Sequence, residues 1–149
     1  MKRHLPFGLF LIFITVFFTS CIKDTYTRYE DNIVGTWTFE KVTKNSTIAT
    51  GRNDLTHEWD MYELTFYSNG DAELFDNRRQ TSSHGSWTLS EVVGSNSEGE
   101  TLEYVINLSI IDRAQIKQYS WQVTSVTQRK LRLMEYYNRD YYYYVLERQ

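Results

Sequence analysis

Apolar and polar residues alternate with a period of two along most of the chain after residue 34. Such alternation is typical of a β-strand with one buried face. The clearest run is 101–111, in which one face collects the apolar side chains Leu102, Tyr104, Ile106, Leu108 and Ile110. Eight such runs can be counted, over residues 34–43, 59–67, 71–78, 84–89, 101–111, 115–126, 131–137 and 141–146. No stretch that predicts an amphipathic helix remains.

Two connections between these runs are long. Residues 45–56 and 90–100 are rich in small and polar side chains and have no period, so both predict irregular loops. If the strands close into a barrel, the loop at residues 45–56 would overhang one of its mouths.

The turn at residues 68–70 allows a prediction about register. A two-residue loop would place Phe66 opposite the acidic Glu73. A three-residue loop with Gly70 in the left-handed conformation pairs Phe66 with Ala72 instead, which keeps apolar residues together. We therefore predict a three-residue loop with a bulge.

Eight consecutive strands joined mostly by short turns predict an all-β fold. The architecture that follows is an eight-stranded antiparallel up-and-down barrel over residues 33–149, after an N-terminal signal segment. Closure of the sheet removes exposed edges, and a barrel of this size holds its own side chains plus one small ligand. An open, strongly curved sheet or a sandwich is the alternative.

The composition agrees with one such domain. The 149 residues are 41% hydrophobic and 23% charged, as in ordinary globular proteins, and the 16% that are aromatic favour strands. The single cysteine, Cys21, excludes an internal disulfide and a thiolate metal cluster.

The N-terminus has the layout of a secretory signal. Lys2 and Arg3 precede an apolar run over residues 7–18, which is too short to cross a bilayer as a helix, and small residues lead to Cys21. This arrangement resembles the lipobox of bacterial lipoproteins, in which the signal is removed and the cysteine is acylated with chains such as palmitate. An ordinary cleaved signal with an incidental cysteine is the alternative.

The lipobox resemblance divides the N-terminal part into a signal peptide, residues 1–20, and a lipidated N-terminus with a tether, residues 21–32. Two or more acyl chains anchor a protein stably. The resemblance therefore implies a protein anchored in the bacterial cell envelope, at the outer membrane, on its periplasmic or its surface face. Lys23 and Asp24 resemble the export signals of surface lipoproteins, and an arbitrary polar linker explains them equally well.

Loss of the signal also changes the charge. Removing Lys2 and Arg3 leaves 14 basic against 19 acidic residues, a formal charge of −5. This balance argues against a basic surface for nucleic acid.

Gly35 and Trp37 open the first strand, and a row of short strands follows them. With the runs at 62–70, 85–89 and 121–133, this order resembles the small lipocalin-like lipoproteins of Gram-negative bacteria over residues 33–148. The resemblance implies a calyx that holds a small hydrophobic molecule.

In that family the Gly-x-Trp motif packs at the closed end of the barrel beneath a basic side chain from the last strands. The resemblance makes Arg148 the match for this partner, with Arg132 or Arg139 as alternatives.

Aromatic side chains supply the candidate ligand-binding residues, because the predicted register turns them inward: Trp37, Phe39, Tyr62, Phe66, Trp87, Tyr104 and Trp121. Aromatic walls with a few polar groups commonly line apolar pockets. The alternative is that these rings fill the barrel. The four tyrosines at 141–144 place two rings on each face, and the outward pair could contact a protein, a glycan or the membrane, or reflect strand propensity alone.

The sequence predicts no catalytic residues, no metal site and no cofactor. His57 and His84 are the only histidines after the signal, and neither belongs to a zinc-helix signature. There is no Gly-x-Ser-x-Gly elbow, and acid pairs such as Glu63 with Asp76 are usually solvated surface groups. We therefore expect a protein that is not an enzyme.

Two functions remain in view. The first is a membrane-anchored, lipocalin-like lipoprotein that binds a small hydrophobic ligand in its barrel. The second is an envelope scaffold or accessory protein whose solid barrel acts through its outer face and loops, for partners that the sequence does not identify. A cavity below roughly 300 Å³ would favour the second. An inhibitor that uses residues 45–56 is a third possibility.

Overall fold

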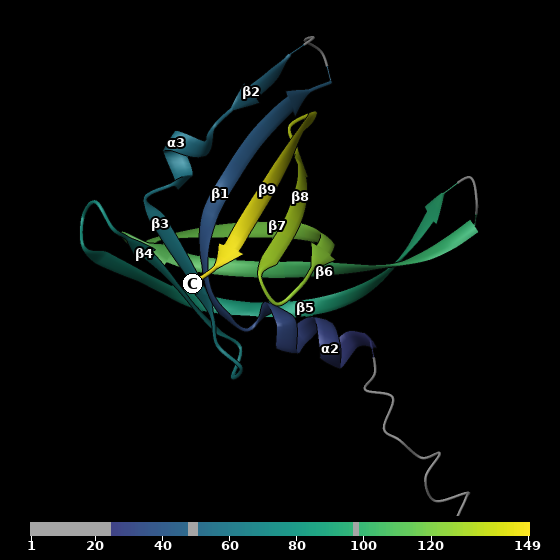
Figure 1. Cartoon of the computed structure of the whole chain (residues 1–149), viewed down its shortest axis with the longest axis horizontal. Helices are drawn as coiled ribbons and strands as arrows, with labels where there is room; N and C mark the ends of the chain where they lie inside the picture. Colours follow the sequence, from purple (N-terminus) through teal and green to yellow (C-terminus); the bar gives the residue numbers. More distant parts are fainter. Residues whose placement is uncertain (1–24, 48–50, 97–98) are drawn as a thin grey trace, which may run out of the picture.

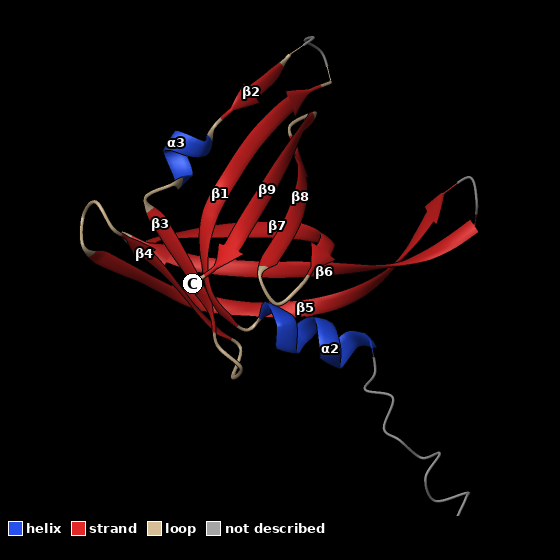
Figure 2. Ribbon diagram, in the orientation of Figure 1, coloured by secondary structure: helices blue, strands red, loops and turns tan. Residues whose placement is uncertain are grey.

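The computed structural model describes residues 25–47, 51–96 and 99–149, and Figures 1 and 2 show strands wound around a common axis. The strands are β1 (Gly35–Ser46), β2 (Arg52–Asp54), β3 (Tyr62–Phe66), β4 (Asp71–Asp76), β5 (Thr81–Asn96), β6 (Gly99–Asp112), β7 (Gln115–Val126), β8 (Lys130–Tyr137) and β9 (Asp140–Arg148). In the described ranges two helices accompany them, α2 (Thr25–Ile33) and α3 (Thr56–Trp59).

Eight of these strands form a closed antiparallel barrel. From β3 to β9 each strand pairs with the next in sequence, and β1 pairs with both β3 and β9, which closes the sheet. The predicted up-and-down barrel is thus confirmed, and the open sheet and the sandwich are excluded. The short β2 is an additional strand that pairs only with the far half of β1, where Lys44 lies opposite Asn53.

Alternate side chains turn into the barrel and pack it. Among the residues that the structure describes, nineteen hydrophobic ones are buried: Ile33, Trp37, Phe39, Val42, Leu64, Phe66, Ala72, Trp87, Leu89, Tyr104, Ile106, Leu108, Ile110, Trp121, Val123, Leu131, Leu133, Tyr144 and Leu146. Burying one large apolar side chain contributes about 1.5–3 kcal/mol, so this core is the main source of stability.

The register predicted for the turn at 68–70 is confirmed. Phe66 lies opposite Ala72, and the N–H of Tyr67 donates to the carbonyl of Asp71 over 2.9 Å. Gly70 has a φ of 86°, a conformation that glycine adopts without steric cost.

The prediction of an irregular loop at 90–100 was wrong. Strands β5 and β6 continue their pairing through this region as far as Asn96 opposite Gly99. Figure 1 shows this part of the hairpin projecting from the barrel as a two-stranded arm, which we call the β5–β6 arm (residues 92–96 and 99–103). Because both faces of the arm are outside the barrel, it lacks the apolar alternation by which strands are recognised.

The connection after β1 was also predicted as irregular, and there the structure holds β2 and the start of α3. Trp59, predicted as the first residue of a strand, instead ends α3. The segment is fixed on β1, because the N–H of Leu55 donates to the carbonyl of Val42 over 2.9 Å. Thr56 Oγ1 accepts a bond of 3.0 Å from the N–H of Val42. Trp59, which lies just outside the predicted loop, packs against the rings inside a barrel mouth.

Residues 25–33 are a helix, whereas the sequence predicted a tether as far as residue 32 and no helix. Helix α2 packs against the end of the barrel: Ile33 is fully buried, and the ring of Tyr29 stacks on that of Tyr104 with centroids 4.3 Å apart. The hydroxyl of Tyr26 donates to the carbonyl of Leu89 over 2.8 Å. The predicted signal peptide, Cys21 and the dipeptide at 23–24 lie outside the described residues.

Within the described part of the chain, no helix has the length and apolar character needed to span a membrane.

Candidate functional site

The barrel end at α2 is sealed by one arginine. The guanidinium of Arg148 lies over the ring of Trp37, with Cζ 4.5 Å from the ring centroid. Its Nη1 and Nη2 donate to the carbonyls of Val34 (2.8 Å) and Asn32 (2.5 Å), at the last turn of α2. A cation that binds the free carbonyls of a helix C-terminus stabilises that helix.

Glycine at position 35 makes this arrangement possible. Its φ of 139° is unfavourable for other residues, and a Cβ there would collide with Nη1 of Arg148. The indole Nε1 of Trp37 donates to the carbonyl of Ile33 over 2.8 Å. The structure therefore places Arg148 where the sequence resemblance implied a basic partner, while Arg132 and Arg139 are exposed elsewhere.

Six of the seven candidate ligand-binding aromatics lie in the packed core. Their side chains are at most 7% exposed: Trp37, Phe39, Phe66, Trp87, Tyr104 and Trp121. Five of these rings contact one another or neighbouring aromatic rings, as Phe66 and Trp87 do at 5.1 Å between centroids, and Trp37 lies beneath the guanidinium of Arg148. The seventh, Tyr62, is half-buried and lines a cavity at the other end of the barrel.

This cavity has a volume of about 380 Å³ and opens at the barrel mouth opposite α2. Its apolar lining is Trp59, Tyr62, Leu74, Ile111 and Tyr119, and three hydroxyl residues, Thr81, Ser82 and Ser83, lie along β5. Three acidic and three basic side chains complete it: Glu58, Asp76, Asp112, Arg79, Arg113 and Lys117. The site thus combines an aromatic wall with a charged rim.

Trp59 is the centre of the aromatic wall. Its ring lies 6.2 Å from the centroids of Tyr62 and Tyr119, and 5.4 Å and 4.9 Å from those of Tyr144 and Phe39. Most of these pairs are T-shaped, an arrangement that aromatic quadrupoles favour. One residue of α3 therefore joins the cavity to the core.

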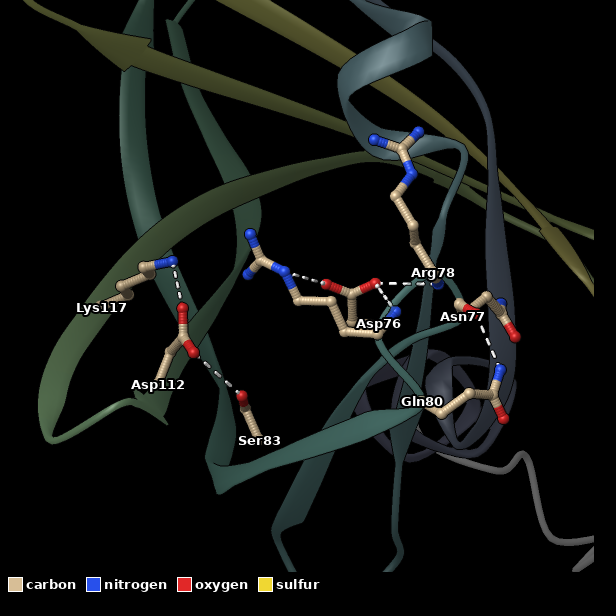
Figure 3. A network of polar contacts seen from close by, with 8 residues as sticks. Asp76, Asn77, Arg78, Gln80, Ser83, Asp112 and Lys117 are labelled. Atoms are coloured by element: carbon tan, nitrogen blue, oxygen red, sulfur yellow. Dashed lines mark hydrogen bonds and ion pairs between the residues drawn. The ribbon is translucent and has the colours of Figure 1, made fainter.

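The charged rim is built on two tight turns, and Figure 3 gives a close-up view of them. In the turn after β4, Oδ1 of Asp76 accepts from the N–H groups of Arg78 (2.9 Å) and Arg79 (3.0 Å). Next to the turn after β6, Lys117 Nζ donates to Oδ2 of Asp112 over 2.6 Å. Figure 3 shows Asp112 between Lys117 and Ser83, so the turn is tied to the start of β5.

The ionisation of the rim follows from these contacts. The hydrogen bond with Lys117 lowers the pKa of Asp112, and the same bond raises the pKa of Lys117. Both groups are therefore charged at neutral pH. Burial in the aromatic wall raises the pKa of Tyr119, which keeps its phenol neutral.

The sequence contains a signal for this mouth that the search for aromatic residues missed. On the inner face of β6 the apolar series ends in Asp112, and on β7 the inner series runs back from Trp121 through Tyr119 to Lys117. A change from apolar to charged side chains at the end of an inward-facing series marks the open end of a barrel. Trp59 carried no such signal, because its helix has a single turn.

No three His, Cys, Asp or Glu side chains in the described ranges gather closely enough to hold a metal ion.

A scan against protein-family models finds no match for this chain, and searches of curated proteins and of solved structures find none either. The functional argument therefore depends on the geometry of the barrel and its mouth.

Proposed function

We propose that this protein is a binding module, without catalytic activity, that holds a small lipophilic compound at the open mouth of its barrel. The observation that carries the proposal is the cavity of about 380 Å³ with an aromatic wall formed by Trp59, Tyr62 and Tyr119. Small-molecule sites are concave, usually larger than roughly 300 Å³, and commonly have aromatic side chains in their lining. A solid scaffold does not require such a cavity.

The packing of the core limits the size of the ligand. Trp37, Phe66 and Trp121 are almost fully buried and belong to the core that fills the barrel. A long acyl chain lying along the axis would have to displace them, which would cost several kcal/mol for each large side chain. The site therefore suits a compact molecule, bound against Trp59 and Tyr119.

We further propose that Cys21 is lipidated and that the protein is anchored in the bacterial envelope, at the outer membrane. Thr25, the first residue of α2, is four residues after Cys21. Four residues reach at most about 14 Å. An anchor at Cys21 would therefore hold the sealed end of the barrel near the bilayer, and the mouth would open away from it, toward the aqueous phase.

Native mass spectrometry of the chain purified without residues 1–21 tests the binding proposal. We expect a copurifying lipophilic compound in the native protein and its loss in Trp59→Ala, which removes the centre of the aromatic wall. Tyr137→Ala is the matched control, because this tyrosine is 59% exposed outside the cavity. A native protein that is free of ligand under gentle conditions would favour the scaffold hypothesis instead.

The anchor is tested separately by fractionating cells that express the full-length chain. Cys21→Ala should abolish incorporation of labelled palmitate and release the protein from membranes. If the variant stays in the membrane fraction, lipidation at this cysteine is not what holds it there.

A further inference from the structure

We propose that the ligand carries one anionic group, bound at the rim of the cavity by the guanidinium groups of Arg79 and Arg113. This inference rests on the proposed function and names the chemical class of its ligand. It follows from which charged groups at the rim already have partners and which do not.

Two of the three carboxylates at the rim, those of Asp76 and Asp112, already have partners. Asp76 is 6% exposed and accepts two backbone N–H bonds within its own turn. Asp112 is bonded to Lys117 at 2.6 Å, and Ser83 approaches its other oxygen at 3.5 Å. A cationic ligand would have to compete with these internal donors. The third carboxylate, Glu58, lies 4.0 Å from Nε2 of His57 with its side chain 56% exposed, so water and salt screen its charge.

The arginines are in the opposite situation. Arg79 has a single loose ion pair, with Nε 3.8 Å from Oδ2 of Asp76, and its side chain is 55% exposed. The guanidinium of Arg113 makes neither a hydrogen bond nor an ion pair within 4.0 Å of another described side chain; it attracts the neighbouring Asp112 only through space, and it lines the same cavity. Each guanidinium presents five N–H donors in a plane, which matches the oxygens of a carboxylate or sulfonate.

The backbone places these arginines on two neighbouring turns of the mouth, since the start of β5 pairs with the end of β6. Arg79 belongs to the turn between β4 and β5, and Arg113 to the turn between β6 and β7. Arg113 and Ala114 have φ values of 50° and 64°, a left-handed conformation in which Asn and Gly are the usual residues. This two-residue turn holds Arg113 at its tip, where the residue lines the cavity.

The geometry points to a compact acid with a planar, apolar body. The body would lie on the rings of Trp59 and Tyr119, and the anionic group would face the two arginines. The ion pair between Lys117 and Asp112 would remain intact and fix the turn that carries Arg113.

Two fluorescent probes with the same ring body test this inference. 1-Anilinonaphthalene-8-sulfonate carries a sulfonate, and N-phenyl-1-naphthylamine is its uncharged counterpart. We expect the sulfonate to bind the native protein about tenfold more tightly, as one charge-assisted contact would provide. The double variant Arg79→Gln with Arg113→Gln should remove this preference and leave the affinity for the neutral probe unchanged. Arg132→Gln, on the exposed outer face of β8, should retain the preference.

The possible results separate this inference from the proposed function. If the two probes bind equally, or if the preference survives in the double variant, the anionic class is wrong while the binding function stands. If Trp59→Ala weakens the binding of neither probe, both proposals fail. Raising the salt concentration to 0.5 M should weaken only the sulfonate, because salt screens charges on an exposed rim.

Discussion

Arg148 shows how much of this fold can depend on one residue. Its guanidinium covers the Trp37 ring and binds two carbonyls at the end of α2, and its position is possible only because residue 35 has no side chain. The contacts join the last strand, the first strand and the N-terminal helix. Arg148 therefore acts as a staple between parts of the chain that are far apart in sequence.

Replacing Arg148 with glutamine should destabilise the barrel by about 2–3 kcal/mol. The change removes two charge-assisted hydrogen bonds and a cation–π contact, and it leaves the carbonyls of Asn32 and Val34 without these donors. Urea unfolding followed by tryptophan fluorescence would measure the loss. Arg132→Gln, a change of the same chemistry on an exposed side chain, should alter stability by less than about 0.5 kcal/mol. Equal effects in the two variants would show that Arg148 has no special role.

At the scale of whole elements, α2 and the β5–β6 arm make opposite contributions. Helix α2 buries Ile33 completely and contacts the core through Tyr29. The arm projects from the barrel, with Val93 and Leu102 exposed by 65% and 55%. The shorter element is thus part of the core, and the longer one is not.

Removing the two elements in turn tests this difference. A chain that begins at residue 34 should be at least about 2 kcal/mol less stable than one that begins at residue 24, because it loses the burial of Ile33 and the bonds to Trp37 and Arg148. Replacing residues 93–102 with Asn-Gly, which joins the paired Val92 and Glu103, should change stability by less than about 0.5 kcal/mol. Both differences can be measured by urea unfolding. A large loss on shortening the arm would mean that it packs against the barrel.

The same contrast explains which elements the sequence could predict. The barrel strands were predictable because one buried face imposes alternation, as Ile106, Leu108 and Ile110 show. The arm was missed because neither of its faces is buried. Helix α2 has nine residues and forms through packing on the barrel, so its local sequence held little information.

At the scale of the whole molecule, the barrel changes in character along its axis. One end is sealed by α2 and Arg148, aromatic and aliphatic side chains fill the middle, and charged groups surround the open mouth. The inward aromatics were predicted, but six of the seven fill the core and only Tyr62 reaches the cavity. The site itself could not be predicted, because it depends on which turns meet at the mouth and on the position of Trp59 above them.

The boundary between core and mouth makes the stability of the molecule sensitive to alkaline pH. Tyr144 is 3% exposed beneath Trp59, and burial is the main cause that raises its pKa well above the ordinary value of 10.0. Its folded form therefore retains the phenol proton at a pH where the unfolded chain releases it. The contribution of this group to the free energy of unfolding is therefore fully present below pH 10. Above pH 10 it should decrease, by at most about 1.4 kcal/mol per pH unit.

Tyr144→Phe isolates this contribution, and the free energy of unfolding in urea between pH 8 and pH 11.5 would measure it. The hydroxyl of Tyr144 donates to Oε2 of Glu135 over 3.0 Å, so the variant should be about 1 kcal/mol less stable at pH 8. It has no phenol to ionise at this position, and its stability should fall less steeply above pH 10 than that of the native protein. The two curves should therefore approach each other as the pH rises. Parallel curves would mean that ionisation of Tyr144 is not coupled to unfolding and that water reaches this ring in the folded barrel.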